Sequence, residues 1–143
     1  CTGERSRSKL IDFHTRHKLL IMAHSPDHYR TLGRLVASLK GSDTDESYNK
    51  YIELLAQGLM HKATPAKHVN VLQHAMGYFK KQLTPDEKAE ILELLAHFRA
   101  GELPLIVPVT LINHFVRKYD QPYLKDQWYL KPHPMELKLR NHV

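Results

Sequence analysis

The chain has 143 residues, the size of one domain, and its 42% hydrophobic and 25% charged residues exclude a disordered chain. Its apolar runs are too short to cross a membrane, and residues 1–9 lack the apolar stretch of a secretory signal, which together predict a soluble, cytoplasmic protein. The net charge of +6, with eleven histidines in addition, favours a polyanionic partner, although a charge of this size is also a common solubility margin.

Helix start and stop signals divide the chain into segments. Ser25 and Thr64 each precede a proline, which places a capping hydroxyl before a proline at the first helical position. Thr84, followed three residues later by a glutamate, has the pattern of a capping box. Gly41 and Gly101 lie where a helix would end in a residue of positive φ. Together with apolar spacings of three and four, these signals predict helices over about 8–24, 26–40, 44–61, 65–82 and 85–100.

Within these helices the apolar stripes define the expected core. The stripe of the third helix is predicted to consist of Tyr48, Tyr51, Ile52, Leu55 and Leu59. Further on, Leu105–Val107 lies between two prolines and is predicted as a turn or short extended piece, with a sixth helix that begins near Pro108.

The two ends of the chain differ from its middle. Residues 1–8 are expected to be flexible, and residues 121–143 are expected to form an irregular segment, rich in proline and aromatic residues, that packs on the bundle. Tyr123, Trp128, Tyr129 and Leu130 are predicted to lock that segment in place. Since no run alternates with period two for long enough to indicate a sheet, the predicted fold class is all-α: a single-domain bundle of about six helices.

The first helix is unusually rich in histidine. Steps of three and four place His14, His17 and His24 on one stripe, and Arg16 and Lys18 lie beside it. Imidazoles at this spacing can share a metal ion, but the stripe holds no carboxylate, so contact with solvent or phosphate is the favoured interpretation. The lone acid of this helix, Asp12, is predicted to pair with Arg16, and orientation of His14 or His17 is its alternative role.

The fourth helix carries a polar stripe opposite its apolar one. The stripe holds amides, imidazole and lysines in the order Lys67, Asn70, Gln73, His74 and Lys81. These groups offer hydrogen-bond donors, acceptors and charge, which suits a nucleic-acid groove, and Tyr78 is a nearby candidate for base stacking. Gly77 in the middle indicates a close approach to the backbone, by a neighbouring helix in the preferred interpretation or by a ligand phosphate or base in the other.

Catalytic signatures are absent from the sequence. It holds no glycine-rich phosphate loop, no serine elbow and no metalloprotease histidine pair. The acids Asp86, Glu87, Glu90 and Glu93 are interpreted as a capped, solvated helix face. The lone cysteine, Cys1, excludes an internal disulfide and a cysteine-ligated zinc or iron–sulfur site within this sequence. The chain is therefore predicted to have no catalytic activity by itself.

Four blocks of the sequence resemble one family. They are LIDFHTRHKLLIMAHSPDHYRTLGRLVA at 10–37, HVNVLQHAMGYFKKQLTPDEK at 68–88, PLIVPVTLINHF at 104–115 and YLKPHPMELKLRN at 129–141. In this order they are similar to the YbgA-like domain, a bacterial domain of unknown function. The resemblance covers nearly the whole chain and implies that many relatives carry this domain behind a TudS-like iron–sulfur desulfidase that acts on thiolated uracil in tRNA.

In such fused proteins the YbgA-like part is expected to hold the RNA. The resemblance implies that an iron–sulfur cluster would belong to a fused or partner desulfidase and that this chain needs no cofactor of its own. It supplies no catalytic residues to carry over. The leading hypothesis is therefore an RNA-binding domain, most plausibly for tRNA, with these contact residues: His14, Arg16, His17, Lys18, His24, Tyr29, Arg30, Lys67, Asn70, Gln73, His74, Tyr78, Lys80, Lys81, His133 and Asn141.

Two other hypotheses belong to different classes. An interaction module could dock on a partner protein through exposed aromatics of the C-terminal segment, namely Trp128 and Tyr129. A histidine-based metal enzyme is the third hypothesis, and the missing carboxylate ligands count against it.

Overall fold

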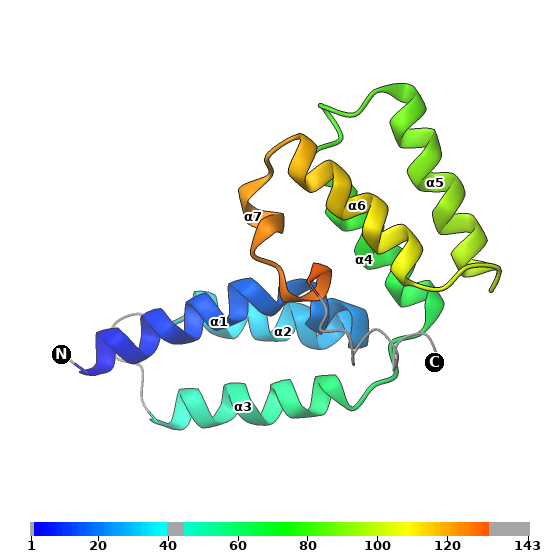
Figure 1. The fold of residues 1–143 in the computed structure, drawn as a ribbon. Helices are drawn as coiled ribbons and strands as arrows, with labels where there is room; N and C mark the ends of the chain where they lie inside the picture. Colours follow the sequence, from blue (N-terminus) through cyan, green and yellow to red (C-terminus); the bar gives the residue numbers. More distant parts are fainter. Residues whose placement is uncertain (1, 40–44, 132–143) are drawn as a thin grey trace. The chain divides into compact units, whose positions relative to one another are not determined.

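The computed structural model describes residues 2–39 and 45–131, with side chains from residue 8 onward. Every regular element in these ranges is a helix, which confirms the predicted all-α class (Figure 1). Contacts divide the chain into two compact units, residues 1–63 and 64–143, and each is described by itself. Among the described helices, none is long and apolar enough to cross a membrane.

The first unit consists of three mutually packed helices, α1 (Thr2–His24), α2 (Pro26–Ala37) and α3 (Asp45–Leu59). Helix α1 begins at Thr2, before the predicted start near residue 8. All three helices contribute to one core, in which partly buried leucines and a valine surround four buried side chains. These four are Leu10, Ile21, Leu32 and Tyr51.

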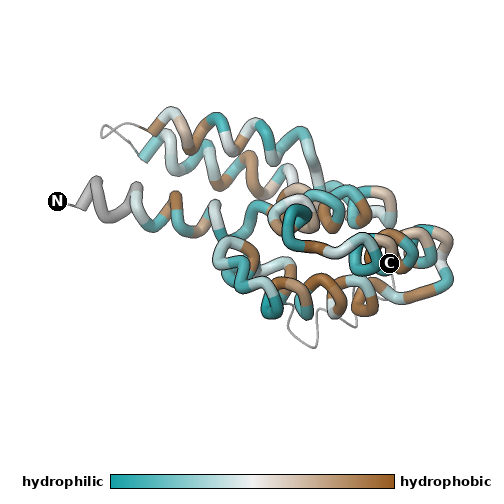
Figure 2. Tube along the Cα trace, turned by 90° about the horizontal axis from the view of Figure 1, so that it is seen from above, coloured by the Kyte–Doolittle hydropathy of each residue, from teal (hydrophilic) through white to brown (hydrophobic). Residues whose placement is uncertain are grey.

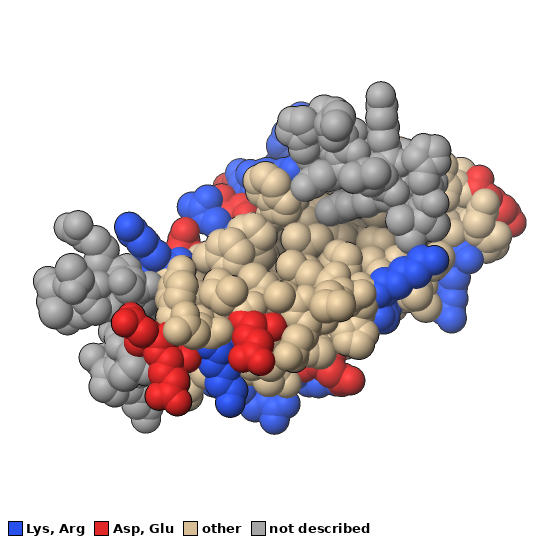
Figure 3. Space-filling model, turned by 90° about the horizontal axis from the view of Figure 1, so that it is seen from below, with Lys and Arg blue, Asp and Glu red and all other residues tan. Residues whose placement is uncertain are grey.

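Helix α3 turns a different face inward from the one predicted. Tyr51 is fully buried, but Tyr48, Ile52 and Leu59 are 47%, 46% and 38% exposed, so the prediction that these three residues pack in the core is wrong. The inner face instead includes Gly58, where a Cβ atom would lie only 2.9 Å from the Cβ of His28 on α2. Glycine permits this close approach of the two helices. Figure 3, seen from the side of α3, shows acidic and basic side chains interspersed with uncharged surface.

The second unit is built on α4 (Pro65–Gly77), α5 (Pro85–Arg99) and α6 (Ile106–Lys118), each packed on the other two. The short helix α7 (Pro122–Lys125) packs on α6, and a 3₁₀ turn follows at Trp128–Leu130. Hydrophobic positions recur at helical intervals along these segments (Figure 2). The core side chains of this unit include Leu72, Phe79, Ile91, Leu95, Ile112, Phe115 and Leu124.

The predicted caps are confirmed. The Ser25 and Thr64 hydroxyls accept the amides of the residues three positions on, at 3.2 and 3.3 Å. The Thr84 hydroxyl accepts the Glu87 amide at 3.1 Å, and the Glu87 carboxylate accepts the Thr84 amide at 2.9 Å, which completes the capping box. Gly101 has a φ of 82°, as expected after a helix end. Gly41 lies outside the described residues.

Two helix boundaries differ from the predicted ones. Helix α4 ends at Gly77 rather than near residue 82, because glycine is the weakest helix former in that stretch. Helix α6 begins at Ile106, so the prediction of a turn or extended piece holds for Leu105, which lies in a turn, and is wrong for Ile106 and Val107. Pro108 lies in the first turn of this helix, where a backbone amide has no intrahelical partner and proline is tolerated.

Glu87 also links α5 to α6. Its carboxylate accepts a hydrogen bond from the Lys118 ammonium at 2.8 Å and another from the Tyr119 hydroxyl. The bond from Lys118, followed by those from the Thr84 amide and Tyr119, lowers the pKa of Glu87 to about 2. The interpretation of Glu87 as a solvated acid is therefore wrong, whereas Asp86, Glu90 and Glu93 are exposed as predicted.

The predicted aromatic lock is only partly correct. Tyr129 and Leu130 are buried, and the Asn113 amide on α6 donates to the Leu130 carbonyl oxygen at 2.6 Å. Tyr123 is half-buried against Tyr78, whereas Trp128 is 43% exposed. The remainder of the predicted C-terminal segment, residues 132–143, lies outside the described residues.

Candidate nucleic-acid interface

His14 is a core residue of the first unit. Its side chain is 2% exposed, and Nδ1 shares a hydrogen bond of 3.0 Å with the Tyr51 hydroxyl. Burial, reinforced by the charge of Lys18, lowers the pKa of His14 to about 4, so the ring is neutral at pH 7. Burial likewise raises the pKa of Tyr51. The prediction that His14 contacts RNA is wrong, because the ring is out of a ligand's reach and uncharged.

The other two histidines of the α1 stripe bind separate backbone groups. His17 Nδ1 donates to the Phe13 carbonyl oxygen at 2.8 Å, and the two rings stack with centroids 4.1 Å apart. His24 Nδ1 donates to the His61 carbonyl oxygen at 2.8 Å. The three imidazoles of the stripe thus point to three different partners. In the part of the chain that the structure describes, no three His, Cys, Asp or Glu side chains are grouped as metal ligands.

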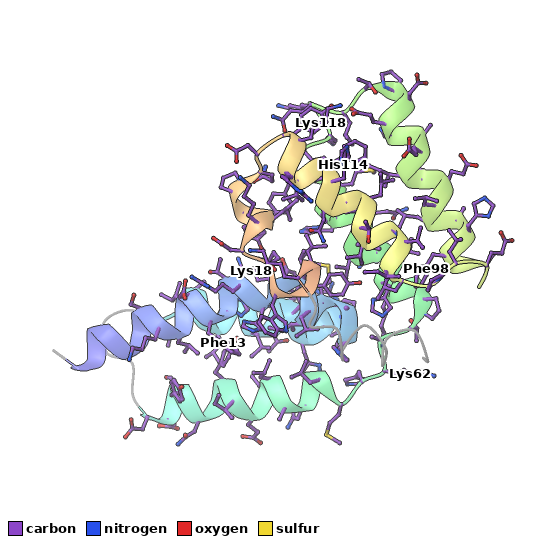
Figure 4. The ribbon with its side chains drawn as sticks, viewed as in Figure 1. Phe13, Lys18, Lys62, Phe98, His114 and Lys118 are labelled. Carbon is purple, nitrogen blue, oxygen red and sulfur yellow. The ribbon has the colours of Figure 1, made fainter. Side chains whose placement is uncertain are left out.

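The exposed arginines among the first unit's candidates are paired with acids. Arg16 forms the predicted ion pair with Asp12 at 3.1 Å, and Arg30 is bonded to Asp27. Tyr29 is half-buried and packs against the core cluster, and its role in stacking stays a prediction. Lys18 is half-buried and lies on the side of α1 away from Phe13 (Figure 4). Both exposed candidate arginines of this unit are therefore already neutralised by acids.

In the second unit, the polar stripe of α4 is exposed. Asn70, Gln73 and His74 all face solvent, and neither amide side chain bonds another described residue. Lys80 and Lys81 follow in the turn after the helix, and both are exposed and form no ion pair with the described residues. Lys67, at the start of the stripe, is half-buried. The predicted amides, imidazole and lysines of this unit thus lie on one helix and the turn that follows it. The two other candidates, His133 and Asn141, lie outside the described residues.

An aromatic cluster adjoins this polar stripe. Tyr78 is 40% exposed and stacks on Tyr123, with ring centroids 4.6 Å apart and an interplanar angle of 19°. The His74 ring meets Tyr78 in a T-shaped contact at 5.7 Å. Gln121 fixes the arrangement, because its Nε2 donates to the Tyr78 carbonyl oxygen at 3.0 Å and its Oε1 accepts the Tyr123 amide at 3.2 Å. A stacking surface is therefore already formed without a ligand.

Sequence reasoning missed Gln121 and assigned Tyr123 only to the aromatic lock, not to this cluster. A polar residue before Pro122 has the pattern of a helix cap, and Gln121 does cap α7. That pattern could have identified the local role of Gln121. Its bond to Tyr78, 43 residues earlier, has no trace in the spacing.

Gly77 is open rather than packed. It is exposed, and a Cβ atom placed there would have no heavy atom of the described residues within 4 Å, apart from its two chain neighbours and the backbone of its own helix. The preferred interpretation, a neighbouring helix against the glycine, is therefore wrong. The backbone beside Tyr78 is left uncovered, which is compatible with the other interpretation, a ligand at this position.

His68 was missed as a structural residue. It is 7% exposed, its Nδ1 lies 2.6 Å from the Tyr129 hydroxyl, and its ring stacks on Tyr129. Tyr129 is fully buried in this contact and cannot dock a partner, so that part of the docking hypothesis is wrong. Of the two aromatics in that hypothesis, the exposed one is Trp128, and docking through it stays a prediction.

Two comparisons with known proteins agree on one family. A search of solved structures finds none that matches. Residues 18–134 match the family model described as "Protein of unknown function (DUF1722)". The chain is 36% identical over 137 residues to "Uncharacterized protein YbgA" of Escherichia coli (strain K12), which covers 95% of this chain and 81% of that relative. Because the model spans most of the chain and the relative aligns over nearly all of it, the chain belongs to the YbgA-like family of DUF1722 proteins.

Proposed function

We propose that this chain is an RNA-binding domain, with tRNA as its RNA, that presents its ligand to a thiouridine desulfidase domain or partner chain. The observation that carries the proposal is the exposed face of α4 and its following turn, where amides, two lysines without described ion pairs and an aromatic cluster lie together. Unpaired lysines attract phosphates, amides bond base edges, and tyrosine stacks on bases.

The second unit is the better candidate for the contact surface. Arg16 and Arg30 of the first unit already hold carboxylates, so a phosphate would have to displace an acid before it gained their charge. Lys80 and Lys81 carry no such competitor among the described residues. The net charge of +6 adds a general attraction for polyanions.

The desulfidase part of the proposal rests on the family resemblance. Desulfidase chemistry with an iron–sulfur cluster needs several cysteine ligands, and this sequence holds one, Cys1. The cluster would therefore belong to a fused or partner domain, and the present chain would contribute RNA binding. A tRNA ligand would place this function in the cytoplasm.

A gel-shift titration with bulk tRNA at two salt concentrations tests the proposal. If Lys67, Lys80 and Lys81 each neutralise one phosphate, raising the salt from 50 to 200 mM should weaken binding roughly 20- to 40-fold. Heparin serves as the polyanion control, since equal binding of heparin and tRNA would show attraction to charge alone. The absence of any shift at micromolar protein and low salt would contradict RNA binding.

A further inference from the structure

The Tyr78–Tyr123 pair is held in place before any ligand arrives. Gln121 bonds the backbone of both tyrosines, at 3.0 Å to the Tyr78 carbonyl oxygen and at 3.2 Å to the Tyr123 amide. The same glutamine caps α7, so the helix that carries Tyr123 is fixed relative to the turn that carries Tyr78. A surface ordered in this way loses little conformational freedom when it binds, and preorganisation of this kind favours a specific ligand contact.

There is open space beside this pair. Tyr78 is 40% exposed, and a Cβ atom on Gly77 would have no heavy atom of the described residues within 4 Å, apart from its two chain neighbours and the backbone of its own helix. A flat ligand can therefore approach the backbone next to the tyrosine ring. A side chain at position 77 would take up part of this open space.

Groups that can bond a base edge lie on the same helix. Gln73 and Asn70 precede Tyr78 by five and eight residues, which corresponds to about 8 and 12 Å along a helix axis. Both amides are exposed and bond no other described residue, and each offers a donor and an acceptor. His74 adds an imidazole in edge contact with Tyr78.

This combination fits an unpaired nucleotide better than a duplex. Bases in a duplex are stacked on one another, and the deep, narrow major groove of A-form RNA hides their edges from side chains. An unpaired base exposes its face to a tyrosine and its edges to amides. Duplex RNA would offer this surface only its phosphates, for Lys80 and Lys81.

We infer that the Tyr78–Tyr123 pair is a binding site for one unpaired base, so that the chain binds single-stranded or loop RNA in preference to duplex RNA. The inference rests on the proposed function, because it names the RNA structure that the same surface selects. Loss of one stacked base of this kind typically lowers affinity roughly 5- to 150-fold.

Fluorescence anisotropy at constant salt tests the inference with two probes, a short labelled oligoadenylate and the duplex that it forms with oligouridylate. The unmodified chain should bind the single strand more tightly than the duplex. Tyr78→Ala should weaken single-strand binding roughly 5- to 150-fold and leave duplex binding nearly unchanged. Tyr78→Phe should restore most of the lost affinity, since the phenyl ring still stacks. Tyr48→Ala on α3 is the matched control, an exposed tyrosine outside the site.

Gly77→Ala separates binding from folding. Because the added methyl group would meet nothing beyond its chain neighbours and the backbone of its own helix, this variant should fold and melt at the same or a higher temperature than the parent chain. It should nevertheless bind the single strand more weakly, because the methyl group occupies the approach to Tyr78.

Each outcome bears on a definite claim. Equal affinity for single strand and duplex, with Tyr78→Ala and Gly77→Ala both without effect, overturns the unpaired-base site but leaves RNA binding intact. Failure of the unmodified chain to bind either probe or tRNA overturns both claims. If circular dichroism shows that Tyr78→Ala is unfolded, a folded Gly77→Ala with unchanged single-strand affinity still overturns the site.

Discussion

Reversal of the charges of Lys80 and Lys81 should weaken tRNA binding roughly 25- to 60-fold at 0.1 M salt, because two phosphate contacts and their released counterions are lost. Both lysines are exposed, and neither forms an ion pair with a described residue, so Lys80→Glu/Lys81→Glu should leave the fold intact. The slope of log K against log salt should fall in magnitude by about 1.4 to 1.8. Anisotropy measured at four salt concentrations gives both quantities.

A matched double variant distinguishes a local contact from general attraction. Lys50→Glu/Arg99→Glu changes the net charge by the same amount, and both residues are exposed outside the proposed surface. This control should reduce the affinity only a few-fold and keep the salt slope. If the two double variants weaken binding equally, the turn after α4 is not the contact surface.

The second large effect is on stability and concerns the buried His14–Tyr51 pair. Tyr51→Phe leaves both ring nitrogens of His14 without a described partner, because Nε2 has none already. His14→Leu leaves the fully buried Tyr51 hydroxyl without a described partner. Each single variant should therefore lower the free energy of unfolding by about 1 to 3 kcal/mol. The double variant His14→Leu/Tyr51→Phe removes both polar groups together. Its stability should lie close to that of the parent chain, or above it. Urea unfolding of the four proteins at pH 7 measures the cycle, and additive losses would contradict a coupled pair.

The same pair makes stability depend on pH in a defined direction. The pKa of His14 is about 4 in the folded chain against an ordinary value of 6.5, so the unfolded chain takes up this proton first as the pH falls. The stability that depends on a neutral His14 is therefore fully present above pH 6.5 and is lost between pH 6.5 and pH 4. This loss lowers the free energy of unfolding by on the order of 3 kcal/mol. His14→Leu should remove this part of the pH dependence, whereas the parent chain should retain it. An unchanged pH profile in His14→Leu would contradict the assignment.

What the sequence predicted well was local. The caps at Ser25, Thr64 and Thr84 depend on residues three positions apart, and all three formed as expected. The exposed amides of α4 followed from the opposite placement of its apolar stripe. Such features need only the period of a helix, which a single sequence contains.

The sequence did not predict contacts between residues that lie far apart along the chain. His14 binds a tyrosine 37 residues away and His68 one 61 residues away, and neither distance leaves a mark in helical spacing. The first unit thus buries the pair His14–Tyr51, although His14 was predicted to lie at the surface. The second unit buries the pair His68–Tyr129, for which the sequence analysis made no prediction. Likewise, the close approach at Gly58 joins α3 to His28, 30 residues away along the chain, and the apolar spacing of α3 alone did not predict that Tyr48 and Ile52 face outward.

The most direct test of RNA binding at the proposed surface is an NMR titration of the ¹⁵N-labelled chain with tRNA. The amide signals of residues 70–81 and of Tyr123 should shift or broaden first, with the largest changes near Tyr78 and the lysine pair. Saturable binding that leaves this segment unchanged and perturbs only α1 or α3, or no perturbation at all at low salt, would contradict the account.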